Sequence, residues 1–260
     1  MDVEVAGIRV RLNVSHRSLD DAAHRRYGAF RSEGEPALTL DVIVRDGEHT
    51  IEAEPVVTHG GGLQYALRYG AVEADLDLET GTGELRVPDD VLYLDAAFRI
   101  TLTLLLLERG GLLMHACGFV RDGRGFVLFG PSGAGKTTVS RMVPPEQVLS
   151  DEVVAVTVGE AGVTAHGTPF YGDLGISNPG SAPAAMLARL HHGDDLLAEL
   201  SPAAATSAVL NSTMFFCHSP HMTERVMEVA SRVALCGVRS LTFRRETHVP
   251  SWIDTAVQAA

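Results

Sequence analysis

Residues 126–138 read Phe-Val-Leu-Phe-Gly-Pro-Ser-Gly-Ala-Gly-Lys-Thr-Thr, the most informative stretch of the chain for its fold class. The apolar residues 126–129 are typical of a buried strand, and residues 130–137 match the pattern G-x-x-x-x-G-K-[ST]. The residues that follow, 137–142, are compatible with a helix. A glycine-rich turn between a strand and a helix is the setting in which this pattern binds phosphate. The stretch therefore predicts an α/β core with a nucleoside-triphosphate site.

Each residue type in the loop has a chemical reason to be there. Glycines let the backbone turn so that successive N–H groups face one anion, and the following helix adds its positive end. Lys136 supplies a positive charge to the β- and γ-phosphates, and the Thr137 hydroxyl is a hard oxygen ligand for Mg²⁺. A glycine-rich turn that binds nothing is the alternative, and the complete motif disfavours it. We expect ATP to contact Gly130, Pro131, Ser132, Gly133, Ala134, Gly135, Lys136, Thr137 and Thr138.

An acidic pair follows the loop after an unusually short helix. Pro144 and Pro145 end that helix, and a strand-like segment at 147–150 leads directly to Asp151 and Glu152. In a strand–helix–strand unit, the end of the second strand lies near the loop after the first. We expect one carboxylate to bind Mg²⁺ and the other to take a proton from an acceptor hydroxyl. The spacing does not assign the two roles, and an ordinary acidic strand end is the alternative.

The order of motifs over residues 112–178 resembles the HPr kinase/phosphorylase family, which is related in fold to phosphoenolpyruvate carboxykinase. The matching features are a strand bearing His115, the turn at 122–125, the phosphate loop, the short helix and the acidic pair. The resemblance implies a P-loop kinase core with a mixed sheet. It also implies that His115 lies near the transferred phosphate and that Asp151 serves Mg²⁺ binding and general-base catalysis. Judged from its strand alone, a lone histidine on an apolar face is more often a core residue.

The sequence departs from the family at two places. Glu152 stands where the HPr kinases carry a second aspartate, and residues 172–178 echo the family's signature segment only in part. Within that segment, Asp173 is the candidate substitute carboxylate for the metal, which makes the expected metal ligands Thr137, Asp151 and Asp173. The departures weaken the case for phosphorylase activity and for HPr as the substrate.

The resemblance is closest to stand-alone relatives that are associated with peptide modification and carry a β-rich N-terminal domain. It implies ATP- and Mg²⁺-dependent transfer of the γ-phosphate to a hydroxyl, foremost a serine of a peptide or small protein. Such catalysis depends mainly on positioning and electrostatic stabilisation, so few reactive residues are needed. Two alternatives stay open: a small-molecule alcohol kinase with the same site, and a nucleotide-binding or sensing module that transfers nothing.

We predict a β-rich N-terminal domain over residues 1–87 and the catalytic domain over 88–260. Apolar residues alternate with polar ones over 3–14, 38–44 and 63–69, which predicts an antiparallel sheet with glycine-containing turns. A helix is expected from about residue 90 to residue 109, since a mostly apolar run there is bounded by Pro-Asp-Asp and Gly-Gly.

The C-terminal part of the chain predicts further strands and helices. The expected elements are a hairpin over 112–129 with its turn at Asp122-Gly123, a second hairpin over 153–166, helices over 181–190, 202–216 and 223–235, and a strand over 238–243.

Three weaker groups of residues do not enter the predicted site. We interpret residues 191–195, His-His-Gly-Asp-Asp, as a solvated turn that ends a helix. The residues Cys217, His218 and His221 have the spacing of metal ligands, but a fourth ligand is missing. The pair at 244–245, Arg-Arg, is within conceivable reach of a phosphate, although a solvated strand end is the simpler interpretation.

The chain has 260 residues and a formal net charge of −12. This charge argues against binding along nucleic acid or on anionic membranes, because both need a basic protein face. The three cysteines include no C-x-x-C pair, and the first residues lack the apolar core of a signal peptide. We therefore expect a cytoplasmic protein, and the resemblance to the hexameric HPr kinases leaves a homo-oligomer open. Because Asp151 and Glu152 would repel a bare triphosphate, we expect ATP to bind together with Mg²⁺.

Overall fold

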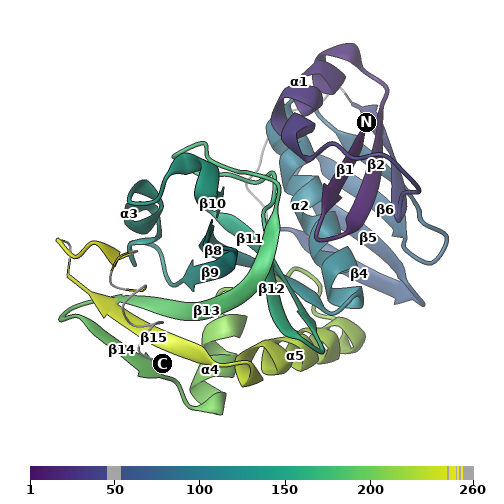
Figure 1. Ribbon diagram of the computed structural model, residues 1–260. Helices are drawn as coiled ribbons and strands as arrows, with labels where there is room; N and C mark the ends of the chain where they lie inside the picture. The colour runs from purple at the N-terminus through teal and green to yellow at the C-terminus, as the bar shows by residue number, and fades with distance from the viewer. Residues whose placement is uncertain (46–53, 245, 250, 252, 254–260) are drawn as a thin grey trace. The chain divides into compact units, whose positions relative to one another are not determined.

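The computed structural model (Figure 1) describes all residues except 46–53, 245, 250, 252 and 254–260. The chain divides into two units. The first unit comprises Met1–Glu108 and Phe215–Glu224, and the second comprises Arg109–Met214 and Arg225–Ala260.

The first unit is built on a seven-stranded sheet in the order β1-β2-β3-β7-β6-β5-β4. Its strands are β1 (Asp2–Val5), β2 (Ile8–Val14), β3 (Leu38–Val44), β4 (Val56–Gly61), β5 (Gln64–Tyr69), β6 (Val72–Asp77) and β7 (Thr82–Val87). The predicted alternation is confirmed, since every second residue of β2 from Ile8 to Leu12 is buried. The sheet is mixed rather than antiparallel, because β3 pairs in parallel with both β2 and β7.

Helix α1 (Arg17–Tyr27) and the 3₁₀ turn η1 (Gly28–Phe30) account for the parallel pairing of β2 and β3. They connect the two strands, so the chain crosses over and β3 runs in the same direction as β2. The sequence analysis missed α1, whose buried residues Leu19, Ala23 and Tyr27 form a narrow stripe. The residue at its N-cap, His16, makes no side-chain cap hydrogen bond that would mark the helix start.

Helix α2 (Val91–Glu108) belongs to the first unit, whereas the predicted boundary after residue 87 assigned it to the second. It contacts α1, β6 and β7. The guanidinium of Arg26 donates two hydrogen bonds of 3.1 Å to the buried carboxylate of Asp95. The rings of Tyr27 and Phe98 meet edge to face with centroids 5.4 Å apart. These contacts between residues far apart in the chain decide where the helix packs.

The second unit contains a mixed eight-stranded sheet in the order β10-β8-β11-β12-β13-β15-β14, with β9 paired to both β8 and β13. Its strands are β8 (Gly111–Arg121), β9 (Arg124–Phe129), β10 (Val148–Ser150), β11 (Val153–Gly159), β12 (Gly162–His166), β13 (Ser181–His192), β14 (Leu196–Glu199) and β15 (Val238–Phe243). The predicted hairpins at 112–129 and 153–166 and the strand at 238–243 are confirmed.

The helix predicted over 181–190 is wrong, because this segment is the long strand β13 (Figure 1). The alanine-rich segment has a good intrinsic helix propensity. In the fold, however, β13 pairs in parallel with β9 along one edge and with β15 along the other. Pairing on both edges satisfies its backbone and buries Met186, Leu187 and Ala188, which outweighs the local preference.

The described residues also form the helical segments α3 (Lys136–Arg141), the 3₁₀ turn η2 (Pro145–Gln147), α4 (Pro202–Leu210) and α5 (Pro220–Leu235). The predicted short helix after the loop is confirmed. Helix α4 ends at Leu210, earlier than the predicted residue 216, and α5 begins at Pro220, three residues before the predicted start.

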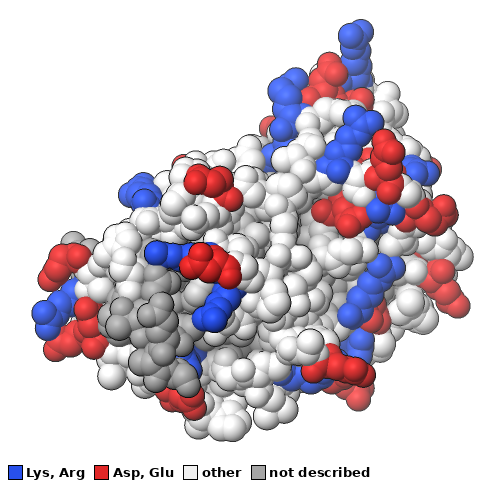
Figure 2. All heavy atoms as spheres, in the orientation of Figure 1, with Lys and Arg blue, Asp and Glu red and all other residues white. Residues whose placement is uncertain are grey.

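Charged side chains of both signs are interspersed over the face of the molecule that Figure 2 shows. The net charge of −12 is therefore not gathered into a single acidic field on this face. Among the helices that the described residues form, none has the length and apolar character needed to cross a membrane.

Candidate phosphate-binding site

The site is organised around one residue of β8, Ala116. On one edge of β8, Ala116 pairs with Phe129, the last residue of β9 before the glycine-rich loop. On the other edge, the N–H of Ala116 donates to the carbonyl of Glu152 at 2.9 Å. The loop and the acidic pair therefore flank the same point of a single strand.

A pocket of about 290 Å³ lies between the loop and the acidic pair. It is lined by His115, Ser132, Gly133, Gly135, Lys136, Thr137, Thr138, Asp151, Glu152, Gly172 and Asp173. Of the described loop residues, Gly130, Pro131 and Ala134 do not line it. Ala134 packs into the hydrophobic core beneath the loop, and the other two present carbonyl groups to Lys136.

The loop backbone can be formed only because glycine occupies two of its positions. Gly133 has a φ of +79° and Gly135 a φ of +106°, conformations that residues with a Cβ rarely adopt. At Gly135 space is also lacking, because a Cβ atom there would lie 2.5 Å from Cζ of the buried Phe243. The buried ring of Phe243, in the core of the second unit, therefore limits the conformations that the loop can adopt.

Lys136 is the only lysine in the chain. Its Nζ donates to the carbonyl of Gly130 at 2.8 Å and to that of Pro131 at 3.2 Å. Burial lowers the pKa of Lys136, and the nearby Glu152 carboxylate opposes that shift. The ammonium is thus held at the base of the loop, at the edge of the pocket where a phosphate would be bound.

The three predicted carboxylates have different surroundings. Asp151 is 5% exposed, and its two oxygens accept hydrogen bonds from the backbone N–H groups of Gly172 and Leu174. Glu152 is half-buried and lines the pocket. Asp173 is exposed and lines the pocket as well. Residues 172–178 echo the signature segment of the HPr kinase family only in part. The fold nevertheless places Asp173 of this segment beside the loop, in the same pocket.

His115 is half-buried and lines the pocket, so it is not enclosed in the apolar core. Its backbone N–H donates to the carbonyl of Ser212 at 2.7 Å. Cys117, two residues further along β8, is buried among the core residues beneath α3. Burial raises the pKa of the Cys117 thiol to about 12, and a hydrogen bond with Ser140 opposes the shift. Cys117 therefore packs in the hydrophobic core and does not line the pocket.

His192 belongs to the site, and the sequence analysis missed it. Residues 191–195 do not end a helix; they form the end of β13 and the turn toward β14. Strand β13 pairs Arg189 with Phe129, so it continues past the end of β9 alongside the loop. There His192 Nε2 lies 2.7 Å from the carbonyl oxygen of Gly133. No local pattern could have indicated this contact, because it depends on the parallel pairing of two distant strands.

The remaining candidates lie outside the pocket. Arg244 binds Asp194 through Nε at 3.1 Å and Nη2 at 2.9 Å, and Arg245 is outside the described residues. His221 Nε2 lies 2.8 Å from Oε1 of Glu108 in the first unit. The described part of the chain contains no group of three or more His, Cys, Asp or Glu side chains that could hold a metal ion.

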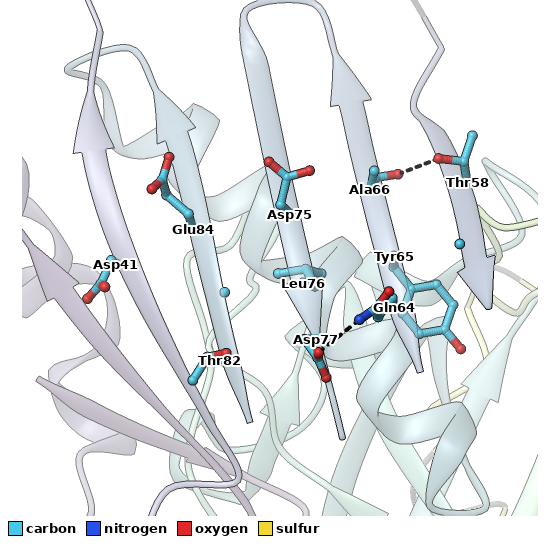
Figure 3. A pocket seen from close by; sticks show the side chains of 12 residues that line it. Asp41, Thr58, Gln64, Tyr65, Ala66, Asp75, Leu76, Asp77, Thr82 and Glu84 are labelled. Atoms are coloured by element: carbon cyan, nitrogen blue, oxygen red, sulfur yellow. Dashed lines mark hydrogen bonds between the residues drawn. The ribbon is translucent and has the colours of Figure 1, made fainter. Parts of the chain in front are cut away.

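A second hollow, of about 560 Å³, lies on the face of the first unit's sheet (Figure 3). Asp41, Glu84 and Asp75 occupy neighbouring positions on adjacent strands in it. Asn13 donates to Asp41 at 3.0 Å, and Arg86 pairs with both Asp75 and Glu84. Like charges directly opposite each other destabilise a sheet, and these partners offset that effect. We interpret this hollow as the polar outer face of the sheet.

Fold and site together define an α/β protein with mixed sheets, whose second unit gathers a glycine-rich loop, its lysine and three carboxylates in one pocket. A family model described as SynChlorMet cassette protein ScmC matches residues 90–235, more than half of the chain. The chain belongs to this family. The matched range contains every residue that lines the pocket. No curated protein matches the chain.

Proposed function

We propose that this protein is a kinase that uses ATP and Mg²⁺ to phosphorylate a hydroxyl, foremost a serine of a peptide or small protein. The observation that carries the proposal is the convergence of Lys136, Thr137 and three carboxylates on one pocket. Phosphoryl transfer needs a phosphate cradle and a group that orients or deprotonates the acceptor, and a merely structural turn needs neither. The motif order over residues 112–178 supports an HPr kinase-like P-loop core for the second unit.

The residues that line the pocket would act mainly by binding the phosphates and by stabilising the charge that develops on them. The N–H groups of the loop residues that line the pocket, Ser132, Gly133 and residues 135–138, and the ammonium of Lys136 would bind the phosphates. The burial of Lys136 strengthens its attraction for an anion, because the surroundings screen charge less than water does. A carboxylate of the acidic pair would take the proton of the acceptor hydroxyl. His115 lines the same pocket, where the resemblance implies contact with the transferred group.

The donor set fits Mg²⁺ that arrives with a nucleotide. Mg²⁺ prefers oxygen ligands, and at nucleotide sites it retains waters and needs only one or two protein groups. The Thr137 hydroxyl and the Asp173 carboxylate line the pocket and are ligands of this kind. When bound, the ion would neutralise charge that develops on the phosphates.

Two further functions share the same loop. A small-molecule alcohol kinase would differ only in its acceptor, and a sensing module would bind ATP without transfer. The acidic pair favours transfer, because a module that only binds MgATP needs carboxylates for the metal but none to take a proton from an acceptor.

The direct test is incubation with γ-labelled ATP, Mg²⁺ and candidate acceptors. The family name describes cassette proteins, so products of neighbouring genes are the first acceptors to test, above all serine-containing peptides. We expect label on a peptide or protein, loss of transfer in Lys136→Ala, and wild-type transfer in the control Arg124→Ala, which alters an exposed turn. Label on a small alcohol would support the second function, and MgATP binding without transfer would support the third.

The single lysine permits an independent test of nucleotide binding. An amine-reactive reagent can modify only the α-amine of Met1 and Lys136. Because burial lowers the pKa of Lys136, its amine is deprotonated more readily than that of an ordinary lysine. We expect MgATP to protect Lys136 and not Met1, and chelation of Mg²⁺ to abolish this protection. If MgATP changed the extent of modification of neither Lys136 nor Met1, nucleotide binding at the loop would be refuted.

A further inference from the structure

The adjacent acids Asp151 and Glu152 meet different groups, although both line the pocket. Asp151 Oδ1 accepts the N–H of Gly172 and Oδ2 accepts the N–H of Leu174, each at 2.9 Å. Its own N–H donates to the carbonyl of Ile176 at 3.2 Å. Both carboxylate oxygens and the backbone of Asp151 are therefore engaged by one short segment, 172–176.

That segment is a tight turn, and Asp151 holds it closed. The N–H of Gly175 donates to the carbonyl of Gly172 at 3.1 Å, and Gly175 has a φ of +67°. Asp151 binds the amides on either side of Asp173. A Cβ at position 172 would lie 3.3 Å from Asp151 Oδ2, so the glycine permits this close approach. The carboxylate of Asp173 is thereby presented to the pocket at the tip of the turn.

Glu152 lines the pocket, and hydrogen bonds on both sides of the residue fix its backbone there. Its N–H donates to Oγ of Ser150 at 3.2 Å, and its carbonyl accepts the N–H of Ala116 at 2.9 Å. The side chain is half-buried, and its charge acts on the ammonium of Lys136. As a whole residue, Glu152 is more exposed than Asp151, which is 5% exposed.

We propose that the two acids have separate tasks: Asp151 is a positioning residue that holds the 172–175 turn and so presents Asp173, and Glu152 takes the proton of the acceptor hydroxyl. This division rests on the proposed kinase function. It differs from the roles that the resemblance to HPr kinases implied, in which Asp151 is the general base.

Phosphoryl transfer forms one bond to the γ-phosphorus and breaks another. The acceptor oxygen forms a bond to the γ-phosphorus of ATP, and the bond from that phosphorus to the β–γ bridging oxygen breaks. The bridging oxygen keeps the electron pair and leaves as part of ADP. The proton of the acceptor hydroxyl moves to the carboxylate of Glu152 and is later released to water.

Three isosteric or near-isosteric variants separate the two tasks: Asp151→Asn, Glu152→Gln and the control Glu160→Gln. Glu160 is an exposed carboxylate at the far end of β11, in the turn to β12. The first readout is hydrogen exchange at the amides of Gly172 and Leu174, which needs no activity. The asparagine amide keeps one acceptor oxygen and replaces the other by NH2, so we expect about tenfold or faster exchange at one or both amides in Asp151→Asn and no change in the other two variants.

The second readout is phosphate release from MgATP, with water in place of the acceptor. We expect Glu152→Gln to lower kcat by about 100-fold or more, as removal of a general base does, at unchanged half-saturating Mg²⁺. Asp151→Asn should raise the half-saturating Mg²⁺ concentration, and adding Asp173→Asn should give no further rise. Glu160→Gln should match the wild type.

Each part of the proposal can be overturned separately. Unchanged exchange at Gly172 and Leu174 in Asp151→Asn, or additive effects of the Asp151 and Asp173 variants on Mg²⁺ dependence, would overturn the positioning role. Wild-type kcat in Glu152→Gln would overturn its role as proton acceptor. If the wild type neither releases phosphate from MgATP nor transfers it to a hydroxyl, the proposed function and the role of Glu152 fail together, while hydrogen exchange still decides the role of Asp151.

Discussion

Replacing Gly135 by alanine tests the phosphate loop at the point where the fold leaves least room. The residue precedes Lys136 and has a φ of +106°. An added Cβ would lie 2.5 Å from Cζ of Phe243 and 3.5 Å from Cε1 of His192. Phe243 is completely buried, so its ring has no free space into which to move.

The expected cost has two parts. A non-glycine residue in a sparsely populated backbone region costs about 1–3 kcal/mol. Forcing extra volume against a packed ring costs about 1–3 kcal/mol more. The folded protein can avoid both costs only by moving the loop, which would displace the amides that we propose bind the phosphates. Gly135→Ala should therefore destabilise the second unit by about 2–6 kcal/mol and weaken MgATP binding at least tenfold.

Chemical denaturation and calorimetric titration with MgATP measure the two effects. Gly133→Ala is the matched control for stability, because Gly133 also has a positive φ, +79°, but no atom lies within 4 Å of an added Cβ. Its destabilisation should reflect the backbone cost alone. In the background Phe243→Leu, which removes the contacted ring, Gly135→Ala should cost less. The reasoning is refuted if Gly135→Ala is no more destabilising than Gly133→Ala, or if Phe243→Leu leaves its cost unchanged.

Three further predictions concern other parts of the molecule. His192→Ala removes the 2.7 Å contact with the Gly133 carbonyl, so calorimetry should show MgATP affinity lowered by up to about tenfold. His192→Gln should recover part of this affinity. Unchanged affinity in His192→Ala would exclude a role for the contact. Because burial raises the pKa of Cys117 from 9.0 to about 12, iodoacetamide at neutral pH should alkylate the exposed Cys236 and spare Cys117 in mass spectra. The same shift means that the unfolded thiol loses its proton first, so the free energy of unfolding should fall from about pH 9 to 12, and Cys117→Ala should flatten this decline. Asp95→Ala removes the buried carboxylate that pairs with Arg26 and Arg99, so urea denaturation should show the first unit destabilised by about 3–5 kcal/mol. A loss below about 1 kcal/mol would contradict a stabilising role for these ion pairs.

Features that depend on neighbouring residues could be predicted from the sequence. The turn at Asp122-Gly123 predicted the hairpin of β8 and β9, because that dipeptide adopts the positive φ values that the turn needs. The two prolines after α3 predicted a short helix for an equally local reason. The glycine-rich loop, its lysine and the acidic pair were all found in this way, and the structure brings them to one pocket.

Features that depend on long-range pairing could not be predicted. Residues 181–190 had helical spacing, yet β9 and β15 made them a strand. The first sheet was expected to be antiparallel, and the unrecognised helix α1 made β2 and β3 parallel. In each case the local preference is worth less than the burial and hydrogen bonding that a distant segment supplies.

The loop, its lysine and the acidic pair could be identified from the residues alone, because the loop motif, the following helix and the acidic pair lie within 27 consecutive residues, 126–152. How the pocket holds these groups depends on contacts that form only in the folded chain. The parallel pairing of β13 with β9 brings His192 to Gly133, and the bridge between Ser150 and Ser177 brings the 172–175 turn to Asp151. A local motif can be recognised from its residue types and their spacing. The contacts of His192 with Gly133 and of Asp151 with the 172–175 turn join residues that become neighbours only when the chain folds.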